Sequence, residues 1–166
     1  MPVLMPKTLK NMNLKVLGQQ QAGKILELTP PSISITYLKA KAGRLIPVPI
    51  PIGFESDFKF SFTMAEYSTL LHSFVGSDIP ILYTALGSLN DDESPSTEGV
   101  RIDITGYLSY SPSAWKPGGS TKDNYDLVCT RCIYTGTAII LIDVEAHIYM
   151  VNGIDVIESI KNKIKL

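Results

Sequence analysis

The two cysteines of this chain, Cys129 and Cys132, have the CxxC spacing that zinc sites and dithiol redox centres use. Positions three apart in an alternating strand point to opposite faces, so we expect these thiols to diverge. The sequence holds no second CxxC pair and no HxxxH pattern that would complete a zinc site. We therefore predict two buried, unreactive cysteines rather than a metal or redox centre.

Three other groups of residues could do chemistry, and each lacks a required partner. His72 and His147 are the only histidines, and no glycine-flanked serine elbow offers either of them a nucleophile to activate. The acidic run 91–93 lacks the ligand pattern and central glycine of a calcium loop. The stretch 118–121 lacks the Lys-Ser/Thr pair that ends a phosphate-binding loop. We therefore expect no enzyme, no cofactor and no metal, and interpret these residues as polar-face, turn and loop positions.

Length and composition describe one globular domain. The chain has 166 residues, of which 45% are hydrophobic and 19% charged, enough for a core and far from a disordered composition. Its formal charge of −1 argues against a duplex-binding module, which normally has a basic excess. The N-terminal residues lack a signal-peptide pattern, and no apolar run approaches the ~20 residues of a membrane span. We therefore expect a chain made in the cytoplasm, with no membrane insertion.

Strand patterns dominate the elements that must position these residues. The sequence FKFSFTM, residues 58–64, alternates most clearly, with apolar side chains on one face and polar side chains on the other. The segment LIPVPIPIG, residues 45–53, has proline at every second position and is expected to be an extended loop or a sheet edge. In all, alternation and composition predict strands at 24–28, 32–38, 56–64, 80–89, 99–108 and 125–135.

The longest strand pattern covers residues 138–151 without a glycine or proline. Fully extended, it would reach ~40 Å, against ~17–20 Å for a usual strand. Such a strand either bends between two sheets or projects beyond its own domain. It ends at a predicted turn at 152–153, after which Asp155 and Glu158 have the spacing of a capping box for a short terminal helix.

One helix is predicted in the middle of the chain. The apolar residues within 67–74 follow the helical period over about three turns. Thr63 and Glu66 have capping-box spacing at its start, and Gly76 stands where a terminating glycine is common. The pattern therefore predicts a single amphipathic helix that follows the strand at 56–64.

The expected fold class is mainly β: a two-sheet antiparallel sandwich or barrel with this central helix and a short C-terminal helix. We expect residues 1–24 to form an N-terminal arm and residues 25–166 to form one β domain, with long loops at 44–53 and 109–124. Long two-faced strands in a lone domain leave edges that are ready to join another chain. A head-to-tail interface closes such edges when its rotation completes a ring.

Several segments, in order and spacing, resemble the major tail tube proteins of contractile-tailed bacteriophages and the related R-type bacteriocins. At the start, PKTLKNMNL leads through a Gly/Gln-rich gap into GKILELTPPSISITYLKAKAGR. In the centre, FKFSFTMAEYSTLLHSF is similar to the family's strand-then-helix unit. The most specific likeness is the closing segment AIILIDVEAHIYMVNGIDVIESIKNKIKL, an Ile-rich strand followed by Asn-Gly-Ile-Asp and a helix.

This resemblance implies a structural subunit of the inner tail tube and no enzyme. Hexameric rings would stack into a conduit for DNA delivery, with four strands per subunit joined into one continuous barrel. The implied partners are further copies of the chain, the tail sheath, the tape-measure protein, and the baseplate and tail terminator proteins, with transient non-specific DNA in the lumen. The implied location is the virion tail, assembled in the cytoplasm of the bacterial host.

The same resemblance implies candidate lumen-facing and contact residues on the surface, but it does not determine which strands line the bore. The candidate lumen-facing residues are Lys59, Ser61, Thr63, Arg101, Asp103 and Thr105. The candidate subunit or ring contacts are Lys7, Lys10, Pro47, Pro49, Trp115, Asp143 and Tyr149. Two alternatives stay open: the tube of a bacteriocin or a type VI-like injection apparatus, and, in a different class, a monomeric β-barrel that binds a small ligand.

Overall fold

The computed structural model describes residues 8–41, 43, 45–54, 58–91, 94–119, 121–136, 138–158 and 162. Every strand ladder in it is antiparallel, which confirms the mainly β class. The elements are β1 (Thr8–Val16), β2 (Gln19–Gln20), β3 (Ile25–Thr29), β4 (Ile35–Ala40), β5 (Val48–Phe54), β6 (Lys59–Met64), α1 (Thr69–His72), β7 (Ile81–Asp91), β8 (Ser94–Pro112), β9 (Asp123–Thr135), β10 (Ile139–Asp143), β11 (Ile148–Val151) and β12 (Ile154–Asp155).

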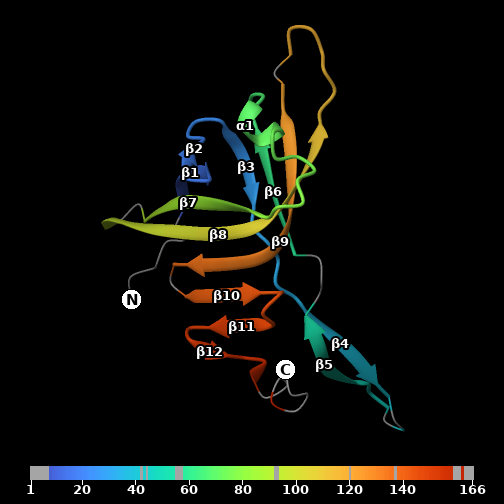
Figure 1. Ribbon diagram of the computed structural model, residues 1–166. Helices are drawn as coiled ribbons and strands as arrows, with labels where there is room; N and C mark the ends of the chain where they lie inside the picture. The colour runs from blue at the N-terminus through green and yellow to red at the C-terminus, as the bar shows by residue number, and fades with distance from the viewer. Residues whose placement is uncertain are drawn as a thin grey trace.

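Ten strands form one sharply bent sheet, and the strands that bend are β8 and β9 (Figure 1). The long half has the order β12-β11-β10-β9-β8-β7-β1-β2. The four-stranded half consists of β3, β6 and the parts of β9 and β8 on the far side of the bend, at 123–129 and 106–112. The described strands do not close into a barrel within one chain. The strands that pass between the two sheet halves are therefore β8, which has 19 residues, and β9, which has 13 residues.

A β-bulge produces the bend. The pairing of β8 with β9 shifts between Thr105 and Gly106, which leaves Thr130 as an extra residue on β9. The Thr130 hydroxyl donates a hydrogen bond to the Thr105 carbonyl at 3.2 Å. A Cβ at position 106 would lie 2.3 Å from the carbonyl oxygen of Val128. Glycine is therefore required at position 106, because a Cβ there would collide with the backbone of β9.

The core lies between the two halves, on the inside of the bend. Phe62 of β6 joins them, because its ring centroid is 5.1 Å from that of Tyr125 in the four-stranded half and 6.3 Å from that of Tyr83 in the long half. The predicted apolar face of 58–64 is thus confirmed. The largest fully buried side chains come from both halves and from α1: Leu14, Val16, Phe60, Phe62, Met64, Leu71, Tyr83, Ile104, Tyr125, Leu127 and Cys132.

The N-terminal segment is part of the sheet. β1 pairs with β7 along most of its length, and both Leu14 and Val16 are completely buried. The prediction of an arm over residues 1–24 is therefore wrong for residues 8–24. Apolar residues at 12, 14 and 16 alternate with the polar residues of this segment and face the core. Residues 1–7, including the predicted contact Lys7, lie outside the described part of the chain.

The C-terminal apolar run is a hairpin, so the prediction of one overlong strand at 138–151 is wrong. β10 and β11 pair with each other and are joined by a turn at 144–147. Asp143 Oδ1 accepts a hydrogen bond from the Ala146 backbone at 2.9 Å, and His147 has a φ of 51°. The polar residues in the middle of the run therefore form the turn, and the apolar residues on either side pair across it.

The Asn-Gly turn after this hairpin is confirmed. Asn152 and Gly153 have φ values of 50° and 84° and join β11 to β12, as in a type I′ turn. Asp155 Oδ1 accepts a hydrogen bond from the Ile157 backbone at 3.1 Å. Most of the predicted C-terminal helix lies outside the described residues.

The central helix is shorter than predicted. α1 has four residues, and its N-cap is Ser68, whose side chain accepts a hydrogen bond from the Leu71 backbone. Thr63, the predicted cap, lies in β6 instead. Gly76 has the left-handed φ of 74° that was expected of a glycine ending this segment. Burial of Leu71 in the core, rather than helix length, fixes α1 against the sheet.

The two predicted loops are partly strand. β5 occupies most of the proline-rich segment 44–53 and, among the described strands, pairs only with β4 as a separate two-stranded ribbon. Prolines at alternate positions lack N–H groups on one side of a strand, which an edge strand tolerates. The predicted loop at 109–124 is shorter, because β8 continues to Pro112 and β9 begins at Asp123.

Candidate assembly surfaces

The outer face of the four-stranded half carries polar side chains along β6. Lys59, Ser61 and Thr63 of β6 alternate with buried residues and point away from the core. Ser61 Oγ donates a hydrogen bond to Asp126 Oδ1 at 2.7 Å, and Thr63 Oγ1 donates to Asn124 Oδ1 at 3.0 Å. These bonds cross from β6 to β9, so the face presents hydroxyl, amide and charged groups held by neighbouring strands.

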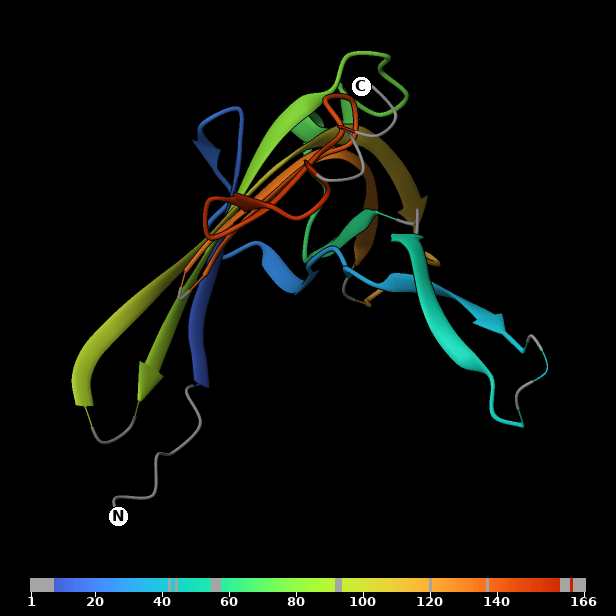
Figure 2. The same cartoon turned by 90° about the horizontal axis from the view of Figure 1, so that it is seen from below.

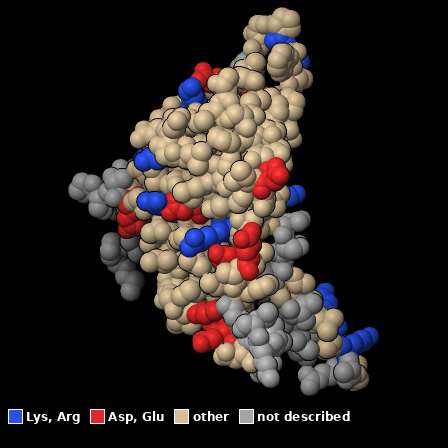
Figure 3. All heavy atoms as spheres, in the orientation of Figure 1, with Lys and Arg blue, Asp and Glu red and all other residues tan. Residues whose placement is uncertain are grey.

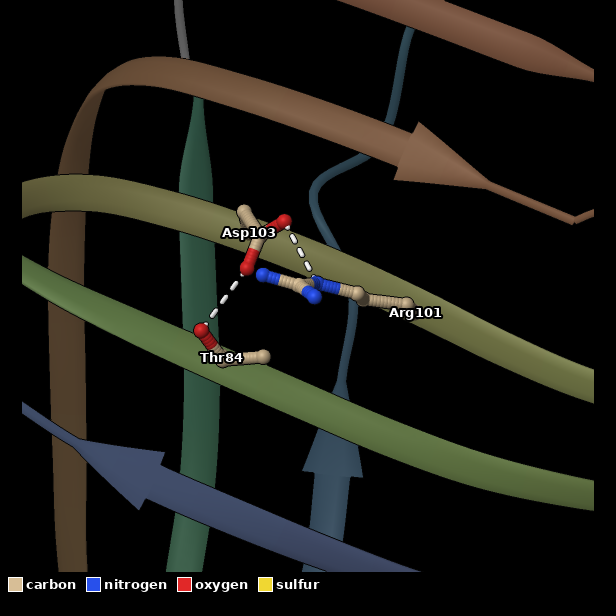
Figure 4. A network of polar contacts seen from close by, with 3 residues as sticks. All are labelled: Thr84, Arg101 and Asp103. Atoms are coloured by element: carbon tan, nitrogen blue, oxygen red, sulfur yellow. Dashed lines mark hydrogen bonds and ion pairs between the residues drawn. The ribbon is translucent and has the colours of Figure 1, made fainter. Parts of the chain in front are cut away.

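The outer face of the long half has a separate polar network (Figure 4). Asp103 Oδ1 accepts a hydrogen bond from Thr84 Oγ1 at 2.7 Å, and Asp103 Oδ2 pairs with Arg101 Nε at 2.8 Å. The hydrogen bond and the charge of Asp103 raise the pKa of Arg101. A second pair joins Arg131 to Asp143. Charges of both signs therefore lie side by side over β8, β9 and β10 (Figure 3).

The structure does not bring the two sets of candidate lumen residues together. Lys59, Ser61 and Thr63 lie on the four-stranded half, which pairs β6 with β3 and β9. Arg101, Asp103 and Thr105 lie in the part of β8 that pairs with β7. Sequence alternation placed each set on the polar face of its strand, but the bend puts these faces on different halves of the sheet.

Two edges of the four-stranded half are open. Among the described strands, β3 pairs only with β6. At the opposite edge, residues 109–112 of β8 pair, within the described part of the chain, only with β9. The loop after α1 covers this edge in part, through one hydrogen bond from the Gly76 backbone to the Leu108 carbonyl at 3.3 Å. Backbone donors and acceptors along such edges can pair with a strand of another chain.

Four of the predicted contact residues lie at exposed positions. Pro47 and Pro49 belong to the proline-rich side of the β4–β5 hairpin, and Lys10 lies on β1. Trp115, in the loop between β8 and β9, has 77% of its surface exposed. A large exposed aromatic side chain is common at the energetic centre of protein interfaces.

The other two predicted contacts, Asp143 and Tyr149, lie on the β10–β11 hairpin. Asp143 closes the hairpin turn and pairs with Arg131, so its carboxylate serves the fold of its own chain. Tyr149 stands opposite Ile142, on the side of the sheet that faces the core, and is half-buried. The described structure therefore gives both residues roles within one chain.

The sequence did not predict an aromatic cluster around His72. His72 Nδ1 lies 2.9 Å from the Ser68 carbonyl oxygen and 3.2 Å from the Tyr125 hydroxyl. Its ring stacks on Tyr67 at 4.0 Å between centroids and meets the edge of Tyr110 at 4.4 Å. The cluster fastens α1 to β8 and β9. Helical periodicity could not predict it, because the partners come from distant strands.

Both cysteines are buried in the core, as predicted, but they do not diverge. The bulge at Thr130 adds one residue between Cys129 and Cys132, so both side chains belong to the same hydrophobic cluster. The burial pattern of β9 shows this change of phase, because the buried positions are odd-numbered up to 129 and the next buried position is 132. Burial raises the pKa of both thiols to about 12.

We predict that these thiols are unreactive in the folded protein. A rise in pKa from 9.0 to about 12 lowers the thiolate fraction at pH 8 by about 10³-fold. Alkylation by iodoacetamide should therefore be slower by at least that factor than in urea. The folded chain also retains protons that the unfolded chain loses above pH 9, so each thiol should lower the free energy of unfolding by about 1.4 kcal/mol per pH unit there. Rapid alkylation of the native protein would contradict this prediction.

Within the described ranges, no group of three or more His, Cys, Asp or Glu residues is placed to hold a metal ion. No helix in this part of the chain has both the length and the apolar character needed to cross a membrane.

The bent open sheet, with edges that are unpaired among the described strands, defines an antiparallel β subunit that can pair with a strand of another chain. The chain matches the family described as phage tail tube protein FII over residues 6–164. It therefore belongs to the phage tail tube protein FII family, and is a tail-associated structural protein that associates with itself. The resemblance found from the sequence is confirmed.

A solved structure shares this fold. It is the sheath/tube terminator, in the extended state, of PVC, an extracellular contractile injection system. The two chains are 12% identical with a TM-score of 0.59, and the similarity covers 80% of this chain and 99% of the terminator. At this level of identity the likeness concerns the fold alone. A comparison with curated protein sequences gives no significant match.

Proposed function

We propose that this chain forms hexameric rings that stack into a tube, and that the tube is a passive conduit for DNA delivery with no catalytic step. The observation that carries the proposal is the four-stranded half, with β3 at one edge and residues 109–112 of β8 at the other, each paired on one side only. A strand edge of this kind accepts a strand from another chain. Repeated head-to-tail, such a contact closes into a ring when its rotation allows.

The fold also favours one face as the lining of the bore. Four strands from each of six copies would make a barrel of about 24 strands, wider than the 16–18 strands that already enclose an aqueous channel. The long half covers the core face of the four-stranded half, so only its outer face can line such a channel. Lys59, Ser61 and Thr63 would then meet water or passing DNA, whereas Arg101, Asp103 and Thr105 would lie elsewhere on the ring.

The remaining partners follow from the proposed place of the tube in a phage tail. A sheath would surround it, a tape-measure protein and then DNA would occupy the bore, and baseplate and terminator proteins would bound its ends. The likeness in fold to a sheath/tube terminator supports surfaces of this type. Assembly in the host cytoplasm and residence in the virion tail complete the proposal. The monomeric ligand-binding barrel is not favoured, because the described sheet is open.

Charge reversal at two positions tests the assignment of the bore. In a ring of six copies, Lys59→Glu would replace six positive charges that face the DNA with six negative charges. We expect this change to weaken binding of a short oligonucleotide to assembled tubes at least about fivefold at low salt. Arg101→Glu is the matched control, since it makes the same charge change on the other half of the sheet. Both variants should still form tubes. Weaker binding with Arg101→Glu and unchanged binding with Lys59→Glu would contradict the assignment.

A further inference from the structure

Backbone directions show which groups face the open side of β3. The Cys129 N–H donates a hydrogen bond to the Phe58 carbonyl at 2.8 Å, so the backbone groups of Phe58 point toward β9. Successive residues of an antiparallel strand point alternately to its two neighbours, so Phe62 also points toward β9. Leu28 stands opposite Phe62 and therefore directs its N–H and carbonyl away from β6. The donors of β3 end just beyond it, because Pro30 follows the strand and has no N–H.

The open side of β8 begins with an acceptor that is already bonded. The Gly76 N–H donates a hydrogen bond to the Leu108 carbonyl at 3.3 Å, on the side where the pairing of β8 with β7 has ended. By the same alternation, Tyr110 directs its N–H and its carbonyl to this side. Pro112 also faces it but offers only a carbonyl. Tyr110 is therefore the first residue beyond the bend that offers a partner strand both a donor and an acceptor.

The turn after α1 is anchored where it bonds to Leu108. Gly76 has a left-handed φ of 74°, and Figure 2 shows this turn (green, top) beside the part of β8 that leaves the bend. His72 fastens α1 to β8, because its ring stacks on Tyr67 and meets the edge of Tyr110 at centroid distances of 4.0 and 4.4 Å. One aromatic cluster therefore holds both the turn and the residue whose backbone faces the open edge.

A ring leaves three registers for the junction between copies. The directions of β3, β6, β9 and β8 alternate across the four-stranded half (Figure 1), so β8 of one copy meets β3 of the next copy antiparallel. Thr29 stands opposite Ser61 on the outer face, and paired residues share a face of the sheet. The positions of β8 that can stand opposite Thr29 are therefore Tyr107, Ser109 and Ser111.

The register with Thr29 opposite Ser109 satisfies both edges. Leu28 of one copy and Tyr110 of the next copy then exchange two backbone hydrogen bonds, as the directions of their N–H and carbonyl groups require. At the next position toward the bend, the proline that follows β3 has no N–H to donate. The β8 carbonyl at this position is the one that already accepts a hydrogen bond from the turn after α1.

The two neighbouring registers lose hydrogen bonds. A shift of two residues away from the bend places Pro30 opposite Tyr110 and brings Pro112 into the other pair, so each pair lacks one N–H. A shift of two residues toward the bend places Leu28 opposite Leu108, whose carbonyl is occupied. Prolines therefore disfavour the first shift, and the turn after α1 blocks the second.

We infer that the turn after α1 sets the register in which copies of this chain join, with Thr29 of one copy opposite Ser109 of the next. The inference rests on the proposed function and adds one residue-level pairing to it. Gly76 supplies to Leu108 the hydrogen bond that Pro30 of the incoming strand cannot donate. Loops that cover a strand edge prevent unwanted pairing, and this loop ends its cover where the partner strand must stop.

Disulfide formation between neighbouring copies measures the register. A chain with Thr29→Cys and Ser109→Cys should give cross-linked oligomers up to the hexamer on mild oxidation, because a pair without backbone hydrogen bonds has Cα atoms about 4.5 Å apart, within disulfide range. Within one chain the two positions lie three strand spacings apart, about 14 Å, which a disulfide cannot bridge. The native thiols are buried.

The same cysteine in β3 provides the register controls. Thr29→Cys is combined with Ser111→Cys in one chain and with Tyr107→Cys in another. In the inferred register these pairs are diagonal neighbours with Cα atoms about 7–8 Å apart, beyond the usual range of a disulfide. Each control should therefore give at least about tenfold less cross-linked product than the pair with Ser109→Cys.

Substitution of Gly76 tests whether the turn is the stop. A Cβ at this position meets nothing within 4 Å, but alanine is strained at a φ of 74°. Gly76→Ala should therefore loosen the turn and raise cross-linking of Thr29→Cys with Tyr107→Cys at least about threefold, because the Leu108 carbonyl becomes accessible. Gly76→Asn is the matched control, since asparagine tolerates this backbone conformation better, and should raise it less.

Each failure has a separate reading. Wild-type rings in electron micrographs, with most cross-linking through Ser111→Cys or Tyr107→Cys, would overturn the register and leave the proposed function standing. Equal cross-linking of Tyr107→Cys with glycine, alanine and asparagine at position 76 would overturn the role of the turn. A wild-type chain that stays monomeric at every concentration would overturn both the inference and the proposed function.

Hydrogen exchange of the wild-type protein covers the case in which a cysteine pair impairs assembly. Ring formation should slow exchange of the Leu28 and Tyr110 amides at least about tenfold, because both become hydrogen-bonded between copies. The Gly76 amide should be protected before and after assembly, since its acceptor lies in its own chain. Unchanged exchange at Leu28 and Tyr110 in rings would overturn the inference.

Discussion

Replacing Gly106 with alanine is expected to lower the free energy of unfolding by about 3 kcal/mol or more, at the upper end of the cost of overpacking a core. The new Cβ would lie 2.3 Å from the Val128 carbonyl oxygen and 3.0 Å from the carbonyl carbon. Both atoms are backbone atoms of β9, so no side chain can rotate to relieve the contact. The bend between the two halves would open, and the core between them would lose its packing. Urea unfolding followed by far-UV circular dichroism measures the change.

Gly99 offers a matched control on the same strand. A Cβ at this position meets nothing within 4 Å, and its φ is outside the positive range. Gly99→Ala should therefore change stability by no more than about 1 kcal/mol, in the stabilising direction, because alanine restricts the unfolded chain. Equal stability of Gly106→Ala and Gly99→Ala would show that the bend does not depend on the close approach of β8 and β9.

Truncating Phe62 to alanine should cost about 3–5 kcal/mol, the range for a buried aromatic residue. Its side chain is 2% exposed and contacts aromatic rings in both halves of the sheet. The loss would therefore separate the halves as well as leave a cavity. Thermal and urea unfolding of the unassembled chain measure the effect, and tube formation should fail at temperatures where the wild type still assembles.

Lys59→Ala is the control for this change, because it truncates an exposed residue of the same strand. We expect a change within about 0.5 kcal/mol, as for surface positions in general. Should Phe62→Ala prove as stable as Lys59→Ala, the two halves would not share the single core described above.

The sequence predicted the local patterns well and the long-range geometry poorly. Strict alternation in β6 gave its buried and polar faces, and Asn152 and Gly153 marked their turn. Both signals depend only on neighbouring residues. The phase change around Thr130 was present in the sequence, but its interpretation requires knowing that β9 continues through it. The bend at Gly106 depends on the approach of a strand that follows later in the chain, which alternation cannot reveal.

The C-terminal run shows a second limit of prediction from alternation alone. Residues 138–151 satisfy the pattern of one long strand, yet Asp143 and His147 turn the chain back. A hairpin and a single strand present the same alternation, and the choice between them depends on which neighbour is available. Here β9 and β12 flank the pair on either side. The polar faces of β6 and β8 were likewise found from the sequence, whereas their separation on two halves follows from the bend.

Electron microscopy of the purified wild-type protein tests the central claim, that the open edges of the four-stranded half join copies of this chain. A reconstruction should show six subunits per ring, with β3 of one subunit hydrogen-bonded to residues 109–112 of β8 in the next and the Lys59 face on the bore. Particles that remain single 18.2 kDa chains at every concentration, or rings in which these two edges stay unpaired, would contradict it.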